Sequence, residues 1–221
     1  MKKNLTELVF IMDRSGSMSG LESDTIGGFN SMLEKQKKEE GDALVTTVLF
    51  DDGFEVLHHR LDIQKVKPIT SKDYYVRGCT ALLDAVGKTI MMIKQEQKTA
   101  SKEDRPDNVL FVITTDGLEN ASKEFTYEKI KKVIEKQTEK HGWKFLFLGA
   151  NIDAAAEAAK VGISSRYSAN YSADGEGTQK NFDAVCMAAN FIRNNEEIRE
   201  DWKMEIEDYL KKKECKKTKL Q

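Results

Sequence analysis

Apolar residues occur along this chain in two patterns. Short uninterrupted runs predict buried β-strands, and longer stretches in which apolar residues recur every three or four positions predict amphipathic helices. The strand pattern occurs at residues 8–12, 43–50, 109–115 and 144–150. The run that begins at Val109 is apolar on both faces, which is typical of a central parallel strand covered by helices on each side.

Helical patterns lie between and after these strands. Three of them span residues 26–33, 82–93 and 127–134. Asp153 is placed to cap a fourth helix over residues 154–161, and Gly162 to end it. Strands that alternate with helices predict an α/β fold, with a doubly wound, mostly parallel, Rossmann-like sheet and helices on both faces.

One pair of strands departs from this alternation. Asp51-Asp52-Gly53 separates the strand at 43–50 from a further strand pattern at 54–61, leaving too few residues for a crossover helix. An Asp-Gly step between two strands is typical of a hairpin. The added strand is therefore expected to run antiparallel at an edge of the sheet, and Asp51 and Asp52 are interpreted as turn residues.

The pattern weakens after residue 150. Residues 164–180 are polar and contain glycines, which predicts a long loop around a short edge strand. Helices are then expected at 178–193 and 196–213, with a break at Asn194-Asn195. We divide the chain into an α/β domain over residues 1–195, with its core at 5–165, and a C-terminal helix with a basic tail over residues 196–221, packed on or extending from the same domain.

Composition indicates a globular protein. Of the 221 residues, 39% are hydrophobic and 33% charged, and the formal net charge of −2 gives no field that favours nucleic acid or a membrane surface. Cys79, Cys186 and Cys215 lack CxxC spacing, which indicates reduced thiols and argues against zinc. The first apolar run is too short for a signal peptide. We expect a cytoplasmic monomer with neither nucleic acid nor membrane as a partner.

Oxygen-bearing side chains follow the first and the central strand. Asp13, Ser15 and Ser17 come directly after the first, Asp116 ends the central one, and Thr80 precedes the helix at 82–93. Ligands of open α/β sheets bind where the carboxyl ends of the strands meet, so these side chains are expected to lie together. Carboxylate and hydroxyl oxygens are hard donors that suit Mg²⁺.

The order Asp13-x-Ser15-x-Ser17, then Thr80, then Asp116 resembles the metal-ion-dependent adhesion site of von Willebrand factor type A domains. The resemblance covers about residues 5–165 and is to stand-alone cytoplasmic members from bacteria and phages. It implies that the three hydroxyls ligate Mg²⁺, or Mn²⁺ or Ca²⁺, with the two aspartates acting directly or through water. It also implies a partner protein whose Asp or Glu completes the coordination.

Three functions are compatible with these residues. The first is a metal-dependent protein-binding module without catalytic residues. The second is a magnesium-dependent phosphohydrolase of the haloacid-dehalogenase type with Asp13 as nucleophile, but that chemistry needs a second aspartate where this chain has Ser15. The third is a structural subunit that binds its partner through the C-terminal helices. The binding module is favoured.

Some of these polar residues also have simpler interpretations. Ser17 or Ser19 could cap the helix that follows them, and Thr80 could cap the helix at 82–93. His58 and His59 are adjacent in a predicted strand, so they point to opposite faces and cannot share one metal ion. Both histidines are expected at the surface.

Overall fold

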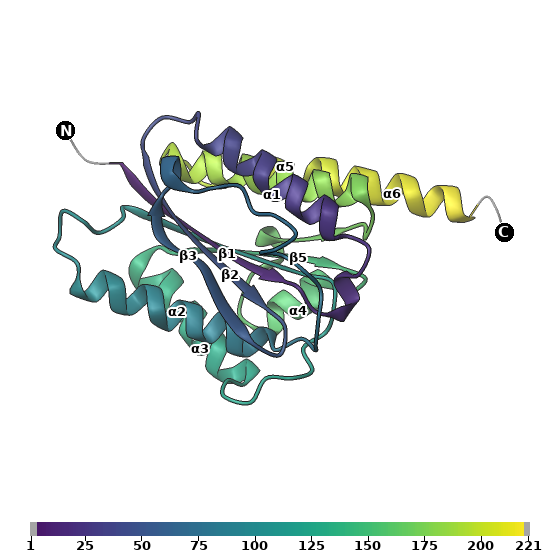
Figure 1. The fold of residues 1–221 in the computed structure, drawn as a ribbon, viewed down its shortest axis with the longest axis horizontal. Coiled ribbons are helices and arrows are strands. Elements are labelled where there is room, and N and C mark those ends of the chain that lie inside the picture. Colours follow the sequence, from purple (N-terminus) through teal and green to yellow (C-terminus); the bar gives the residue numbers. More distant parts are fainter. Residues whose placement is uncertain (1–3, 219–221) are drawn as a thin grey trace.

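The computed structural model describes residues 4–218 and contains one six-stranded sheet (Figure 1). The strand order is β3-β2-β1-β4-β5-β6. The strands are β1 (Leu5–Asp13), β2 (Asp42–Phe50), β3 (Phe54–Asp62), β4 (Asn108–Thr115), β5 (Lys144–Ala150) and β6 (Ser168–Tyr171). All neighbouring pairs are parallel except β2 and β3, which are antiparallel.

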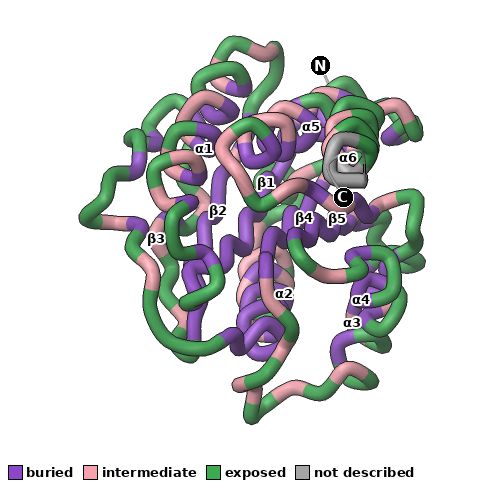
Figure 2. The backbone as a smooth tube through the Cα atoms, turned by 90° about the vertical axis from the view of Figure 1, so that its right-hand side faces the viewer, coloured by how far each residue is buried: buried purple, intermediate pink, exposed green. Residues whose placement is uncertain are grey.

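Helices cover both faces of this sheet. They are α1 (Glu22–Gln36), α2 (Leu82–Thr99), α3 (Tyr127–His141), α4 (Ala154–Lys160), α5 (Gly175–Arg193) and α6 (Met204–Thr218). Helices α1, α5 and α6 lie on one face, and α2, α3 and α4 on the other (Figures 1 and 2). The predicted fold class is confirmed: a doubly wound α/β sheet with one antiparallel edge strand.

Strand β1 runs through the middle of the core. All nine of its residues are buried. Its side chains alternate between two apolar clusters. Leu8 and Phe10 belong to the cluster beneath α1 and α5, whereas Val9 and Ile11 belong to the cluster beneath α2 and α3. Burial on both faces fixes the register of β1, and the strand therefore delivers Asp13 to a defined place at the edge of the sheet.

The helix boundaries expected after residue 150 are partly wrong. The short strand β6 is present, but α5 begins at Gly175, inside the predicted loop at 164–180. It begins there because the Asp174 side chain caps it, accepting a hydrogen bond of 2.8 Å from the backbone N–H of Gly177. Residues 196–199 are not helical. A 3₁₀ turn, η4 (Glu200–Lys203), leads instead into α6.

The C-terminal segment packs against the domain through an aromatic anchor. Trp202 is 1% exposed and belongs to the same cluster as Leu8, as does Ile206 of α6. The Trp202 Nε1–H donates to the backbone oxygen of Arg166 at 3.0 Å. The last residues of the predicted basic tail, 219–221, lie outside the described part of the chain.

No helix within residues 4–218 combines the length and the apolar character needed to cross a membrane. Cys79, Cys186 and Cys215 are free thiols, as the missing CxxC spacing predicts.

Candidate metal centre

The candidate site lies where β1 and β4 end side by side. The two strands are parallel neighbours, and Met12 pairs with Thr114 near their carboxyl ends. Asp13 and Asp116 are therefore brought to the same edge of the sheet, where the sequence predicts them.

Asp13 is held firmly at the end of β1. Its carboxylate accepts hydrogen bonds from the backbone N–H of Ser15 at 2.7 Å and from the Thr115 hydroxyl at 2.6 Å. The Tyr74 hydroxyl donates to the Asp13 backbone oxygen at 2.5 Å. Sequence analysis missed both partners. Thr115 could have been found because it precedes Asp116, whereas no pattern in the sequence points to Tyr74.

Three hydroxyl groups from two loops gather beside Asp13. Thr80 Oγ1 donates to Ser15 Oγ at 2.9 Å, and the Ser15 and Ser17 Oγ atoms are 3.1 Å apart. Gly117 lies against two of them, since a Cβ atom there would be 3.1 Å from Ser17 Oγ and 3.4 Å from Thr80 Oγ1. A side chain at position 117 would therefore crowd the hydroxyls.

The capping interpretation of these hydroxyls is wrong. Helix α2 has Ala81 as its N-cap, and the Thr80 hydroxyl points to Ser15 instead. Helix α1 has Leu21 as its N-cap, so neither Ser17 nor Ser19 caps it.

Asp116 is the residue of this set whose surroundings fit a cation most clearly. Its side chain is 4% exposed, and neither carboxylate oxygen has a hydrogen-bond partner among the described residues. Burial raises its pKa, and the nearby Ser17 hydroxyl partly offsets the rise without reaching hydrogen-bonding geometry. A buried carboxylate with no partner is unfavourable, so this group fits a bound cation.

Asp13 adds a second buried carboxylate. Burial raises its pKa to about 6, the hydrogen bonds from Ser15 and Thr115 oppose the rise, and the charge of Asp116 adds to it. Two buried carboxylates and three hydroxyls form an all-oxygen donor set of the kind that hard divalent ions prefer. Asp13, Ser15, Ser17, Thr80 and Asp116 would together hold such an ion.

Asn120 ties Thr80 to the loop that follows Asp116. Its side-chain oxygen accepts from the Thr80 backbone N–H at 2.9 Å, and the Asn120 backbone N–H donates to the Thr80 backbone oxygen at 3.0 Å. Sequence analysis missed this residue. The loops of Thr80 and Asp116 therefore form one unit.

Nitrogen and sulfur ligands offer no competing site in the described part of the chain. It contains no group of three or more His, Cys, Asp or Glu side chains that could hold a metal. His59 is exposed as expected, but the expectation for His58 is wrong. His58 is buried, with Nδ1 3.0 Å from the hydroxyl of Thr47. Pairing of the two strands turns it inward.

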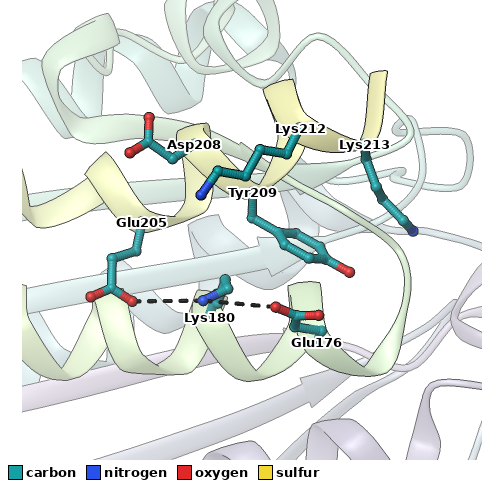
Figure 3. A pocket seen from close by; sticks show the side chains of 7 residues that line it. All are labelled: Glu176, Lys180, Glu205, Asp208, Tyr209, Lys212 and Lys213. Carbon is teal, nitrogen blue, oxygen red and sulfur yellow. Dashed lines mark ion pairs between the residues drawn. The ribbon is translucent and has the colours of Figure 1, made fainter. Parts of the chain in front are cut away.

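A second polar hollow, of about 530 Å³, lies between α5 and α6 (Figure 3). Lys180 stands between two carboxylates there, 4.0 Å from Glu176 and 3.8 Å from Glu205. Its lining residues are Glu176, Lys180, Glu205, Asp208, Tyr209, Lys212 and Lys213. The opposite charges offset one another, so the hollow has no charge preference for a ligand.

The fold is that of von Willebrand factor type A domains, as similarity to solved structures shows. Proximal thread matrix protein 1 from the mussel byssus, solved with a zinc-occupied adhesion motif, superimposes with a TM-score of 0.59 at 16% identity, over 84% of this chain and 46% of that one. The manganese-loaded TRAP protein of Plasmodium vivax superimposes with a TM-score of 0.56 at 13% identity, over 82% of this chain and 74% of that one.

A von Willebrand factor type A structure from Catenulispora acidiphila gives a TM-score of 0.56 at 12% identity, over 84% of this chain and 42% of that one. The chain thus spans less than half the length of the mussel and Catenulispora chains. No protein-family model and no curated protein sequence matches this sequence.

Proposed function

We propose that this chain is a metal-dependent protein-binding module whose ion accepts an acidic side chain of a partner protein. The observation that carries the proposal is the buried, unpartnered carboxylate of Asp116 near the Ser17 hydroxyl, which belongs to the group of hydroxyls formed by Ser15, Ser17 and Thr80. The solved neighbours with zinc or manganese support a divalent ion. The all-oxygen donor set favours Mg²⁺ or Mn²⁺ here.

The residues of this chain determine what such an ion would do. Ser15, Ser17 and Thr80 are neutral ligands, and Asp13 already accepts two hydrogen bonds. With Asp13 acting through water and Asp116 as the single directly bound carboxylate, a bound divalent ion would keep part of its positive charge and supply an electrostatic attachment point for an external carboxylate. Ser15 and Thr80 are buried and their hydroxyls are hydrogen-bonded to each other. These hydroxyls are therefore held in place before a partner arrives, which lowers the entropy lost on binding.

We propose binding rather than catalysis for this site. The hydrogen bonds of the five side chains involve no histidine, lysine or cysteine among residues 4–218. Ser15, at the position where a haloacid dehalogenase needs its second aspartate, accepts a hydrogen bond from Thr80. A site for catalysis would need a base or nucleophile next to the metal. The cytoplasmic location and the bacterial or phage origin stay predictions.

Affinity capture tests the proposed function. The immobilised wild-type protein should retain a partner from a lysate of its native cell in Mg²⁺ and release it in chelator. The Asp116→Ala variant should retain none, whereas Asp183→Ala, which removes an exposed carboxylate paired with Lys35, should behave as wild type. Replacing the partner's contacting Asp or Glu with its amide should abolish retention.

A partner that is retained equally in chelator and by the Asp116→Ala variant would contradict the proposal. Turnover of a phosphomonoester that is lost in the Asp13→Asn variant would support the hydrolase instead.

A further inference from the structure

Asp51, interpreted from the sequence as a turn residue, makes more contacts than the hairpin needs. It follows β2, is 1% exposed, and its Oδ1 accepts from the backbone N–H of Gly53 at 2.5 Å, which closes the turn. Its other carboxylate oxygen, Oδ2, is directed away from the turn and accepts from two arginines. Both arginines belong to loops that carry candidate metal ligands.

The first arginine lies inside the ligand loop. Arg14 stands between Asp13 and Ser15, its side chain is 0% exposed, and its Nε donates to Asp51 Oδ2 at 2.9 Å. Its Nη1 donates to Glu55 at 2.7 Å. A buried guanidinium is stable only with such partners, so the Asp51 carboxylate fixes where this side chain can lie.

The second arginine precedes Thr80. Arg77 Nε donates to the same Asp51 Oδ2 at 2.6 Å, and the Arg77 backbone N–H donates to the Arg14 backbone oxygen at 2.9 Å. The Asp51 backbone oxygen accepts from the N–H of Ala81, directly after Thr80, at 2.8 Å. Both guanidinium groups also lie 5.4 Å from the ring centre of Tyr75. Asp51 is thus the shared anchor of the two loops.

We propose that Asp51 is a positioning residue of the metal centre, which through Arg14 and Arg77 sets the spacing between the loop of Ser15 and Ser17 and the loop of Thr80. The inference rests on the proposed function. None of the hydrogen bonds of Asp51 reaches a ligand side chain, so its effect on the ion is indirect. Groups that hydrogen-bond metal ligands directly change metal affinity by about 10- to 100-fold when they are removed, so the lower end of this range is expected for loss of a contact that acts through the loops.

Arg77→Ala is the cleanest test because the Arg77 side chain is 49% exposed and its loss leaves the buried pair of Arg14 and Asp51 intact. Calorimetric titration with Mg²⁺ should show affinity about tenfold weaker than that of wild type. The electron paramagnetic resonance spectrum of bound Mn²⁺ should broaden, because the ligand geometry becomes less uniform. The melting temperature in chelator should stay close to that of wild type, and Arg77→Lys should recover part of the affinity.

Two further variants complete the test. Asp51→Asn keeps the shape of the side chain but removes the charge that both arginines share, so it should weaken Mg²⁺ binding more than Arg77→Ala does. Arg199→Ala is the matched control. Arg199 is exposed, pairs with Asp201 and lies 4.5 Å from the ring centre of Phe191. Arg77 makes the same two kinds of contact, an ion pair with Asp51 and a cation–π contact with Tyr75. It should leave Mg²⁺ affinity and the Mn²⁺ spectrum unchanged.

The outcomes separate this proposal from the proposed function. If wild type binds Mg²⁺ and Arg77→Ala binds it equally well with the same Mn²⁺ spectrum, the positioning role is wrong while the metal site stands. If wild type binds neither ion, the metal site itself fails and the positioning role with it. Weaker binding in Arg77→Ala but not in Arg199→Ala supports the positioning role.

Discussion

The Asp116→Ala variant should lose the thermal stabilisation that Mg²⁺ or Mn²⁺ gives to the wild-type protein. An ion at about 100 times its dissociation constant adds about 2.7 kcal/mol to the free energy of unfolding, which for a chain of this length raises the melting temperature by about 5 to 10 °C. Removing a ligand that lies buried without another partner should abolish this rise. Asp13→Ala should have the same effect, and differential scanning calorimetry with ion and with chelator measures both.

The stability of Asp116→Ala in chelator distinguishes loss of the ion from loss of the fold. Asp116 is a buried carboxylate near Asp13, so its removal should leave the melting temperature of the ion-free protein unchanged or higher. An ion-induced rise that persists in both variants would contradict the assignment of the site.

The increase in melting temperature that the ion causes should also depend on pH. In the ion-free folded protein the pKa of Asp13 is raised from 3.8 to about 6, so the folded state holds a proton that the unfolded chain releases. The ion-free protein therefore loses stability as pH increases from about 3.8 to about 6. A metal ion must displace this proton, so the rise in melting temperature should be smaller at about pH 5 than at about pH 7.5. In Asp13→Asn, the loss of ion-free stability over this range should be reduced, because the amide does not titrate.

Trp202→Ala should lower the free energy of unfolding by about 3 to 5 kcal/mol. Trp202 is 1% exposed, lies in the cluster that contains Leu8 and Phe10, and donates a hydrogen bond to the backbone of Arg166. Its truncation would leave a large cavity and an unpaired carbonyl beneath the C-terminal segment. Equilibrium denaturation in urea measures the loss.

The exposed Met204, two residues along the chain, provides the control. Met204→Ala should change the free energy of unfolding by no more than about 0.5 kcal/mol. A loss below about 1 kcal/mol in Trp202→Ala would show that the segment from Glu200 onward contributes little to the domain.

The sheet could be predicted from the sequence because burial on both faces leaves long apolar runs. The run from Val109 and the Asp52-Gly53 step predict a central strand and an edge hairpin, and both are confirmed. The start of α5 could not be predicted in the same way. Gly175 and Gly177 resemble a loop, and only the hydrogen bond from Gly177 to Asp174 shows where the helix begins.

Some features of the candidate site could likewise be predicted from the sequence and others could not. Its five oxygen-bearing residues could be named from the sequence because they follow strand ends, and the structure brings them to one edge, although their role as ligands stays a prediction. The residues that hold the ligand loops in position could not be identified from the sequence. Asp51 is interpreted from the sequence as a turn residue, and its pairing with Arg14 and Arg77 could not be foreseen because pairing between distant loops leaves no periodic pattern in a sequence.

The central claim is that the ion held by this chain keeps a coordination position for an external carboxylate. Water-proton relaxation by protein-bound Mn²⁺ tests it without a known partner, because relaxation is enhanced only while water exchanges at the ion. The account predicts strong enhancement in the wild-type protein, a decrease on titration with acetate, and no decrease with acetamide, which has the same shape without the charge. Weak enhancement from the start, or equal responses to acetate and acetamide, would contradict it.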